Sequence, residues 1–255
     1  MDQVLSSQAN FLAFLFVILC LGLIFFFMYF GRHWLKISLR DIQAFRRFQR
    51  EVDLSVEGGK RLHVSLGRGS VNDMPGGASF SGLTILDRCA RAASNSDQPP
   101  MATCVDGVIT ILSQDTLQST YRSLATEQRY DPTTVRLTGL TPMAYAAGAI
   151  PTIHDENVTT NIYAGHFGTE IALLTEAGER SRSLTVAGTD DISAQAVLYA
   201  TSDEPLLGEE LYAAGAYLGT GPSHVASLNM QDIVRWLLVA VIILGAILKL
   251  LGILP

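Results

Sequence analysis

The chain contains 255 residues, of which 48% are hydrophobic and 16% are charged, and it carries a formal net charge of −6. A chain of this length and composition can bury a substantial core. Its middle part is acidic, which argues against a nucleic acid as the partner of that surface. The three cysteines are scattered and form no CxxC pair, so the sequence predicts neither a disulfide framework nor a thiolate metal site.

The first predicted element is an apolar helix near the start of the chain. The twenty residues from Phe11 to Phe30 carry no charge, and a helix of this length spans about 30 Å of hydrocarbon. The residues before it contain no Lys or Arg, unlike the basic start of a secretory signal. We therefore expect residues 1–31 to form a transmembrane helix that is retained.

The opposite end of the sequence is apolar over a similar length. The stretch from Arg235 to Pro255 is interrupted only by Lys249, whose long stem can carry its ammonium group to the membrane interface. An intramembrane ion or proton site at Lys249 is the alternative. We expect a second transmembrane helix at residues 232–255, with interfacial anchors at Trp34, Arg235, Trp236 and Lys249.

The distribution of basic residues predicts the orientation of the chain. The exit of the first apolar helix is rich in Lys and Arg, whereas its opposite flank has none. By the positive-inside rule, the central segment is cytoplasmic and both termini lie outside. The basic residues that support this orientation are Arg32, Lys36, Arg40, Arg46, Arg47 and Arg50.

Residues 32–59 are predicted to form a basic amphipathic helix next to the membrane. Apolar residues recur there every three or four positions, at Leu39, Ile42, Phe45, Phe48, Val52 and Val56. This stripe either belongs to a helix lying on anionic lipid, or packs on the central domain or on a neighbouring subunit. Candidate contacts between subunits are therefore Leu39, Ile42, Phe45 and Phe48. Gly58 and Gly59 are expected to end the helix.

Residues 60–222 alternate between short β-rich runs and helical runs. This pattern predicts an α/β fold, a mostly parallel Rossmann-like sheet of four or five strands with helices on both faces, flanked by the two transmembrane helices. Ser79 and Thr169 are expected to cap two of the helices, and Asp190 or Asp191 a third. The predicted strands are 62–66, 102–105, 134–140, 161–164 and 183–187.

A glycine-rich segment follows the first predicted strand. Asn72 stands where the dinucleotide-binding fingerprint requires its third glycine, and no GxxxxGK[ST] sequence is present. A weaker anion site, formed by backbone N–H groups at the start of the next helix, remains open. With the loop after the fourth predicted strand, the candidate ligand-binding residues are Gly67, Arg68, Gly69, Gly76, Gly77, Ser79, His166 and Thr169.

Three groups of polar residues resemble catalytic or metal sites, but each has a simpler interpretation. His166 and Glu170 could form an acid/base pair, yet no Ser or Cys nucleophile accompanies them, and Glu170 suits the first turn of a helix. Asp190 and Asp191 suit a helix cap, and the consecutive side chains of residues 154–156 point in different directions. We expect no catalytic residue, no metal and no cofactor.

The run EELYAAGAYL, from Glu209 to Leu218, is predicted to be a helix rich in small residues. Small residues allow another backbone to approach closely, so this helix is either interior or a contact between subunits. The corresponding candidate contacts are Tyr212, Ala213, Ala214, Gly215 and Tyr217.

The runs LHVSLGRG and EELYAAGAYLG, with one apolar span at each end, resemble an uncharacterised bacterial membrane-protein family, a domain of unknown function. The resemblance implies a two-pass topology in a bacterial plasma (inner) membrane. It implies no activity and no catalytic residue.

Two hypotheses about function follow from the sequence. The first is a non-enzymatic scaffold, anchored in the lipid bilayer, whose cytoplasmic domain self-associates into a homo-oligomer and contacts other membrane proteins. The alternative is a membrane sensor or enzyme that holds a nucleotide or another anionic metabolite in its glycine-rich strand-end loops.

Overall fold

The computed structural model describes residues 2–34, 39–69 and 76–251. The chain divides into two compact units. One contains the two ends of the chain, residues 1–39 and 221–255, and the other contains residues 40–220.

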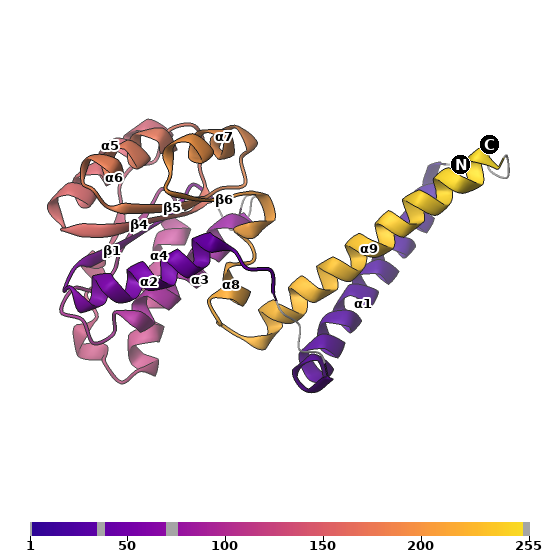
Figure 1. The fold of residues 1–255 in the computed structure, drawn as a ribbon, viewed down its shortest axis with the longest axis horizontal. Coiled ribbons are helices and arrows are strands. Elements are labelled where there is room, and N and C mark those ends of the chain that lie inside the picture. The colour runs from indigo at the N-terminus through magenta and orange to yellow at the C-terminus, as the bar shows by residue number, and fades with distance from the viewer. Residues whose placement is uncertain (1, 35–38, 70–75, 252–255) are drawn as a thin grey trace. The chain divides into compact units, whose positions relative to one another are not determined.

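The first unit consists of two long helices. Helices α1 (Asp2–Trp34) and α9 (Pro222–Leu250) run antiparallel, side by side (Figure 1). Each contains a segment long and apolar enough to cross a membrane, judged by length and composition. Helix α9 begins at Pro222, well before the predicted span at residues 232–255. Proline is tolerated there because it lies in the first turn of the helix.

The second unit is built on a parallel sheet, which confirms the predicted α/β fold. In the described part of the chain the sheet has six strands in the order β3-β2-β1-β4-β5-β6, and all neighbours pair in parallel. Two of these are three-residue edge strands, and Pro205 in β6 is tolerated because an edge strand has one unpaired side. The strands are β1 (Arg61–Gly67), β2 (Met101–Cys104), β3 (Val135–Leu137), β4 (Val158–His166), β5 (Leu184–Gly188) and β6 (Glu204–Leu206).

Helices cover both faces of this sheet (Figure 1). One face packs against α2 (Gln43–Glu57), α3 (Gly76–Ala92), α4 (Gly107–Ser123) and the short α8 (Ala214–Tyr217). The other face packs against α5 (Pro142–Asp155), α6 (Ile171–Arg180) and α7 (Ile192–Thr201). Short 3₁₀ turns occur at Glu127–Arg129, Pro132–Thr134 and Gly208–Glu210.

The structure decides between the alternatives for the amphipathic helix. Phe45, Phe48 and Val52 of α2 are buried and belong to the core cluster of the sheet. Their apolar stripe therefore packs on the α/β unit of the same chain. Phe45 and Phe48 are not available to a second subunit in this conformation, which corrects that prediction for these two residues.

Several predicted helix boundaries are wrong. Helix α3 begins at Gly76, so Ser79 lies inside the helix and is not its cap. Glu170, not Thr169, occupies the N-cap position of α6. The predicted cap of α7 is confirmed, since the Asp191 side chain accepts the Ala194 N–H at 2.8 Å. The run Glu209–Leu218 is not one helix, because a 3₁₀ turn and the four-residue α8 replace it.

Candidate functional site

The strand order reverses between β1 and β4, and this position locates the candidate site. Strand β1 is followed by α3 on one face, whereas β4 is followed by α6 on the other. In open parallel sheets, ligands bind beyond the carboxyl ends of the strands at such a reversal. Gly67 at the end of β1 pairs with His166 at the end of β4, and Arg68 N–H donates to the His166 carbonyl at 2.8 Å.

Close contact between the two strand ends depends on glycine. Gly67 has a φ of +66°, and a Cβ on it would lie 2.4 Å from the His166 carbonyl oxygen. A Cβ on Gly165 would lie 2.0 Å from the Leu66 carbonyl oxygen. Any other residue at either position would separate the strands at the edge where the candidate site lies.

Arg68 is the cationic group of the site, and Glu170 orients it. Arg68 Nε lies 3.4 Å from Glu170 Oε1, while the same carboxylate accepts the Gly168 N–H at 2.9 Å. Glu170 is only 4% exposed, whereas the Arg68 side chain is 32% exposed. Among the described residues, Arg68 Nε is a buried donor without a hydrogen-bond acceptor. Glu170 therefore holds the buried side of the guanidinium, and the exposed part of the Arg68 side chain is the part that an incoming anion can reach.

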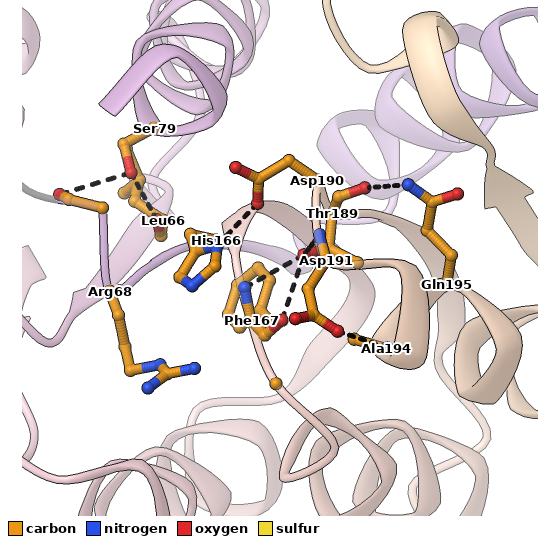
Figure 2. A network of polar contacts seen from close by, with 12 residues as sticks. Leu66, Arg68, Ser79, His166, Phe167, Thr189, Asp190, Asp191, Ala194 and Gln195 are labelled. Atoms are coloured by element: carbon orange, nitrogen blue, oxygen red, sulfur yellow. Dashed lines mark hydrogen bonds and ion pairs between the residues drawn. The ribbon is translucent and has the colours of Figure 1, made fainter. Parts of the chain in front are cut away.

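His166 pairs with an aspartate in the loop after β5, and not with Glu170, which the sequence analysis considered as a possible partner but did not favour. Its Nδ1 lies 2.7 Å from Asp190 Oδ1, and both side chains are about one-fifth exposed. Figure 2 shows the His166 ring turned toward Asp190 at the end of β5. A carboxylate beside Nδ1 favours the tautomer that carries its proton on Nδ1, which leaves Nε2 to accept a hydrogen bond from a ligand.

Thr189 fixes the loop that carries Asp190. Its hydroxyl accepts the Phe167 N–H at 3.0 Å and donates to the Phe167 carbonyl at 3.2 Å. These bonds tie the loop after β5 to the loop after β4 (Figure 2). The His166–Asp190 pair therefore lies beside two loops that the Thr189 hydroxyl holds together, and a rigid frame of this kind suits a binding site.

The start of α3 forms another side of the candidate site. The buried Ser79 hydroxyl donates to the Leu66 carbonyl at 3.1 Å and to the Gly69 carbonyl at 3.4 Å, which ties α3 to the end of β1. Gly76 is buried, and a Cβ on Gly77 would lie 3.4 Å from the Tyr212 ring. Residues 70–75 of the glycine-rich segment lie outside the described residues.

The described residues do not fit the dinucleotide-binding arrangement. Strand β1 and α3 are separated by residues 68–75, where that arrangement requires a tight turn. The close approach of helix to strand occurs later, at Gly82 of α3, where a Cβ would lie 2.2 Å from the Ala164 carbonyl oxygen. Arg68, His166 and the start of α3 therefore come together although the connection from β1 to α3 is longer than that arrangement requires, and Thr169 is exposed.

A buried polar network lies beneath the site and was missed from the sequence. His63 of β1 is fully buried, with Nδ1 2.9 Å from Asn161 Oδ1 and Nε2 2.9 Å from Thr103 Oγ1. The Tyr145 hydroxyl continues the network to Thr103 at 3.1 Å and to Ser65. Burial lowers the pKa of His63 to about 4, so His63 is neutral at physiological pH. In the sequence, the only signal for a buried His63 was its polar position in the alternation of apolar and polar residues along β1.

A groove of about 860 Å³ lies elsewhere, at the amino-terminal edge of β5 and β6. Its charged lining includes Arg47, Glu51, Glu176, Arg182 and Asp203. Arg47 is bound to Glu204 at 2.8 Å, and one Asp203 oxygen accepts the Thr185 N–H at 2.8 Å. Because Arg47 and Asp203 already have partners and the groove lies at the opposite end of the strands from the candidate site, this groove is the weaker candidate.

The predicted subunit contacts near the end of the α/β unit are mostly internal. Ala213, Ala214 and Gly215 are buried within the chain, which supports the interior alternative for this run. The Tyr217 ring stacks on Phe45 at 4.9 Å. Four predicted contacts keep some exposed surface, namely Leu39, Ile42, Tyr212 and Tyr217.

The predicted membrane anchors have diverse surroundings. Arg235 lies 3.5 Å from Asp232 one turn earlier in α9, Trp236 is 72% exposed, and Lys249 is in the last turn. The Trp34 side chain lies outside the described residues. In the described ranges, no group of three or more His, Cys, Asp or Glu side chains could hold a metal ion.

Comparisons with known proteins identify a family without an assigned activity. No curated protein and no solved structure is detectably similar to the chain. A family model described as "Domain of unknown function (DUF6754)" matches residues 2–254. The coarse part of the predicted resemblance, a domain of unknown function with an apolar helix at each end, is thereby confirmed. The chain belongs to the DUF6754 family.

Proposed function

We propose that this protein is a membrane-anchored receptor domain that binds an anionic small molecule, such as a nucleotide, at the carboxyl ends of β1 and β4. The observation that carries the proposal is the placement of Arg68 and His166 on adjacent strand ends at the reversal of the strand order. Arg68 supplies the positive charge, and His166 supplies a hydrogen-bonding nitrogen whose tautomer Asp190 sets.

The Arg68–Glu170 ion pair makes a sharp test possible. A bound anion and Glu170 compete for the same guanidinium, so the two partners should respond to substitution in opposite directions. Arg68→Ala should abolish binding of ATP or inorganic phosphate. Glu170→Gln should strengthen that binding severalfold, because the amide oxygen can still accept the Gly168 N–H while the competing charge is gone.

Binding would be measured by isothermal titration and by thermal shift on the full chain in detergent. The matched control is Arg88→Ala, which removes an exposed arginine of α3. Arg88 lies about 18 Å along the helix axis from Gly76, the first residue of α3. ATP or phosphate binding that is unchanged in Arg68→Ala, or lost equally in Arg88→Ala, would refute the proposal.

The anchoring in this proposal rests on α1 and α9. We propose that both helices cross a bacterial plasma membrane, with the α/β unit in the cytoplasm and both termini outside, as the arginines after α1 favour. Native Cys89 and Cys104 are buried and burial raises the pKa of each thiol, to about 12 and about 11, so they should not react.

A cysteine introduced at exposed Gln118 should therefore react with an impermeant maleimide only after the cells are opened. A cysteine introduced at Ser6, before the first apolar span, should react in intact cells. Labelling of Gln118→Cys in intact cells would refute the cytoplasmic placement.

Self-association of the α/β unit is the second candidate function, and exposed apolar side chains favour it. Leu140, Met143 and Ile192 are 76%, 63% and 84% exposed on this unit. Apolar surface of this kind is covered in many assemblies by a further copy of the chain. Ile192→Asp and Leu140→Asp should lower the particle mass in size-exclusion chromatography with light scattering, and a wild-type monomer would refute this candidate.

A further inference from the structure

The last part of the α/β unit is bound to its first part. We call Leu207–Thr220 the exit segment, because only Gly221 separates it from the start of α9 at Pro222. Arg40 Nη2 lies 3.2 Å from Glu210 Oε1, and the Tyr217 hydroxyl donates to the Arg40 carbonyl at 2.6 Å. The Gln49 amide donates to the Tyr217 carbonyl at 3.2 Å. The points where the chain enters and leaves the unit are thus held together.

The exit segment is also bound to the candidate site. Gln195 of α7 bridges the two. Its Nε2 donates to the Thr189 carbonyl at 2.9 Å (Figure 2). Its Oε1 accepts the Gly208 N–H at 3.3 Å. Thr189 directly precedes Asp190, the partner of His166. Gln195 therefore joins the loop of the His166–Asp190 pair to the beginning of the exit segment through hydrogen bonds.

The exit segment has the construction of an element that can take two arrangements. It contains a 3₁₀ turn and the four-residue α8, in place of a long regular helix. Gly208 and Gly219 lie near its two ends with φ values of +58° and +69°, which only glycine adopts without strain. Short turns between such glycines rearrange at lower free energy than the sheet does.

We infer that occupancy of the candidate site is transmitted through Gln195 to the exit segment, and so to the chain that continues into α9. The inference rests on the proposed function, since it assigns the regulation of that same site. A ligand that engages His166 changes its bond to Asp190 and shifts the loop that carries Thr189. The hydrogen bond between Gln195 and Gly208 then shifts or breaks. The exit segment consequently changes its contacts with Arg40 and Gln49.

Hydrogen exchange of the full chain in detergent tests the inference even without a ligand. Asp190→Asn removes the charge that His166 contacts and should speed exchange of exit-segment amides at least threefold. Asp191→Asn is the matched control, because it removes the same charge one residue later while Asn keeps the helix cap. In the Gln195→Ala background, Asp190→Asn should have no further effect. Exchange in α4 should stay constant in every variant, which excludes general unfolding.

Two results would overturn the inference. One is an Asp190→Asn effect that persists in the Gln195→Ala background, and the other is an exit segment that does not respond to Asp190→Asn. A titration with ATP separates this inference from the proposed function. Arg68-dependent ATP binding without a change in the exit segment would remove the coupling and leave the binding site. A Gln195-dependent Asp190→Asn effect without ATP binding would support the coupling and count against ATP as the ligand.

Discussion

Acid should destabilise the α/β unit through His63. The pKa of this buried side chain is lowered from 6.5 to about 4, first by burial and also by the charge of Arg136. Below pH 6.5, His63 binds a proton in the unfolded chain but stays neutral in the folded chain until the pH approaches 4. The free energy of unfolding therefore falls as the pH falls. At about 1.36 kcal/mol per pH unit, the loss between pH 6.5 and pH 4 is about 3 kcal/mol.

The measurement is urea unfolding of the full chain in detergent, followed by circular dichroism at several values of pH between 7 and 4. Carboxylates also titrate in this range, so the informative quantity is the difference between wild type and His63→Gln. Glutamine can keep a bond to Asn161 or Thr103 but does not titrate. The variant should be less stable at pH 7 and lose less stability in acid. Parallel pH profiles for the two proteins would refute the argument.

Two further pairs of substitutions test the packing of the α/β unit, each by the free energy of unfolding. Phe48→Ala should cost about 3–5 kcal/mol because the ring is 2% exposed in the core, whereas Leu54→Ala on the same helix, where the side chain is 49% exposed, should cost under about 1 kcal/mol. Gly82→Ala should cost at least about 2 kcal/mol, since its Cβ would lie 2.2 Å from a backbone oxygen, while Gly107→Ala meets no atom within 4 Å and should be neutral or stabilising. Equal costs within either pair would contradict the packing described.

The regular parts of the fold were predictable because their signals are local. Alternating apolar runs and helical periodicity located β1, β2 and β5, and long charge-free stretches located the apolar helices. The missed strand β6 has three residues with Pro205 at its centre, and only its neighbour β5 defines it. The run Glu209–Leu218 looked helical because alanine favours helices, but its packing into the core and the positive φ of Gly208 break it into short turns.

The candidate site was only half predictable, because its pairings are set by strand order. Arg68 and His166 were recognised as residues at strand ends, which is visible in the sequence. The sequence offered Glu170, four residues away, only as a possible partner of His166, whereas the actual partner Asp190 follows the neighbouring strand. Glu170 turned out to contact Arg68, which lies about a hundred positions earlier. Contacts between strands that are not consecutive carry no periodic signal in a single sequence.

The buried network under the site explains why these strand ends meet in one register. His63 bonds to Thr103 on β2 and to Asn161 on β4, so one side chain joins the three central strands. A slip of one residue would turn His63 toward the apolar face formed with α3 and leave its ring nitrogens without partners. The same register places Gly67 opposite His166, which brings Arg68 beside the His166 carbonyl. The geometry of the candidate site is therefore a consequence of polar pairing in the core, and a substitution that loosens this network should weaken ligand binding without touching the ligand.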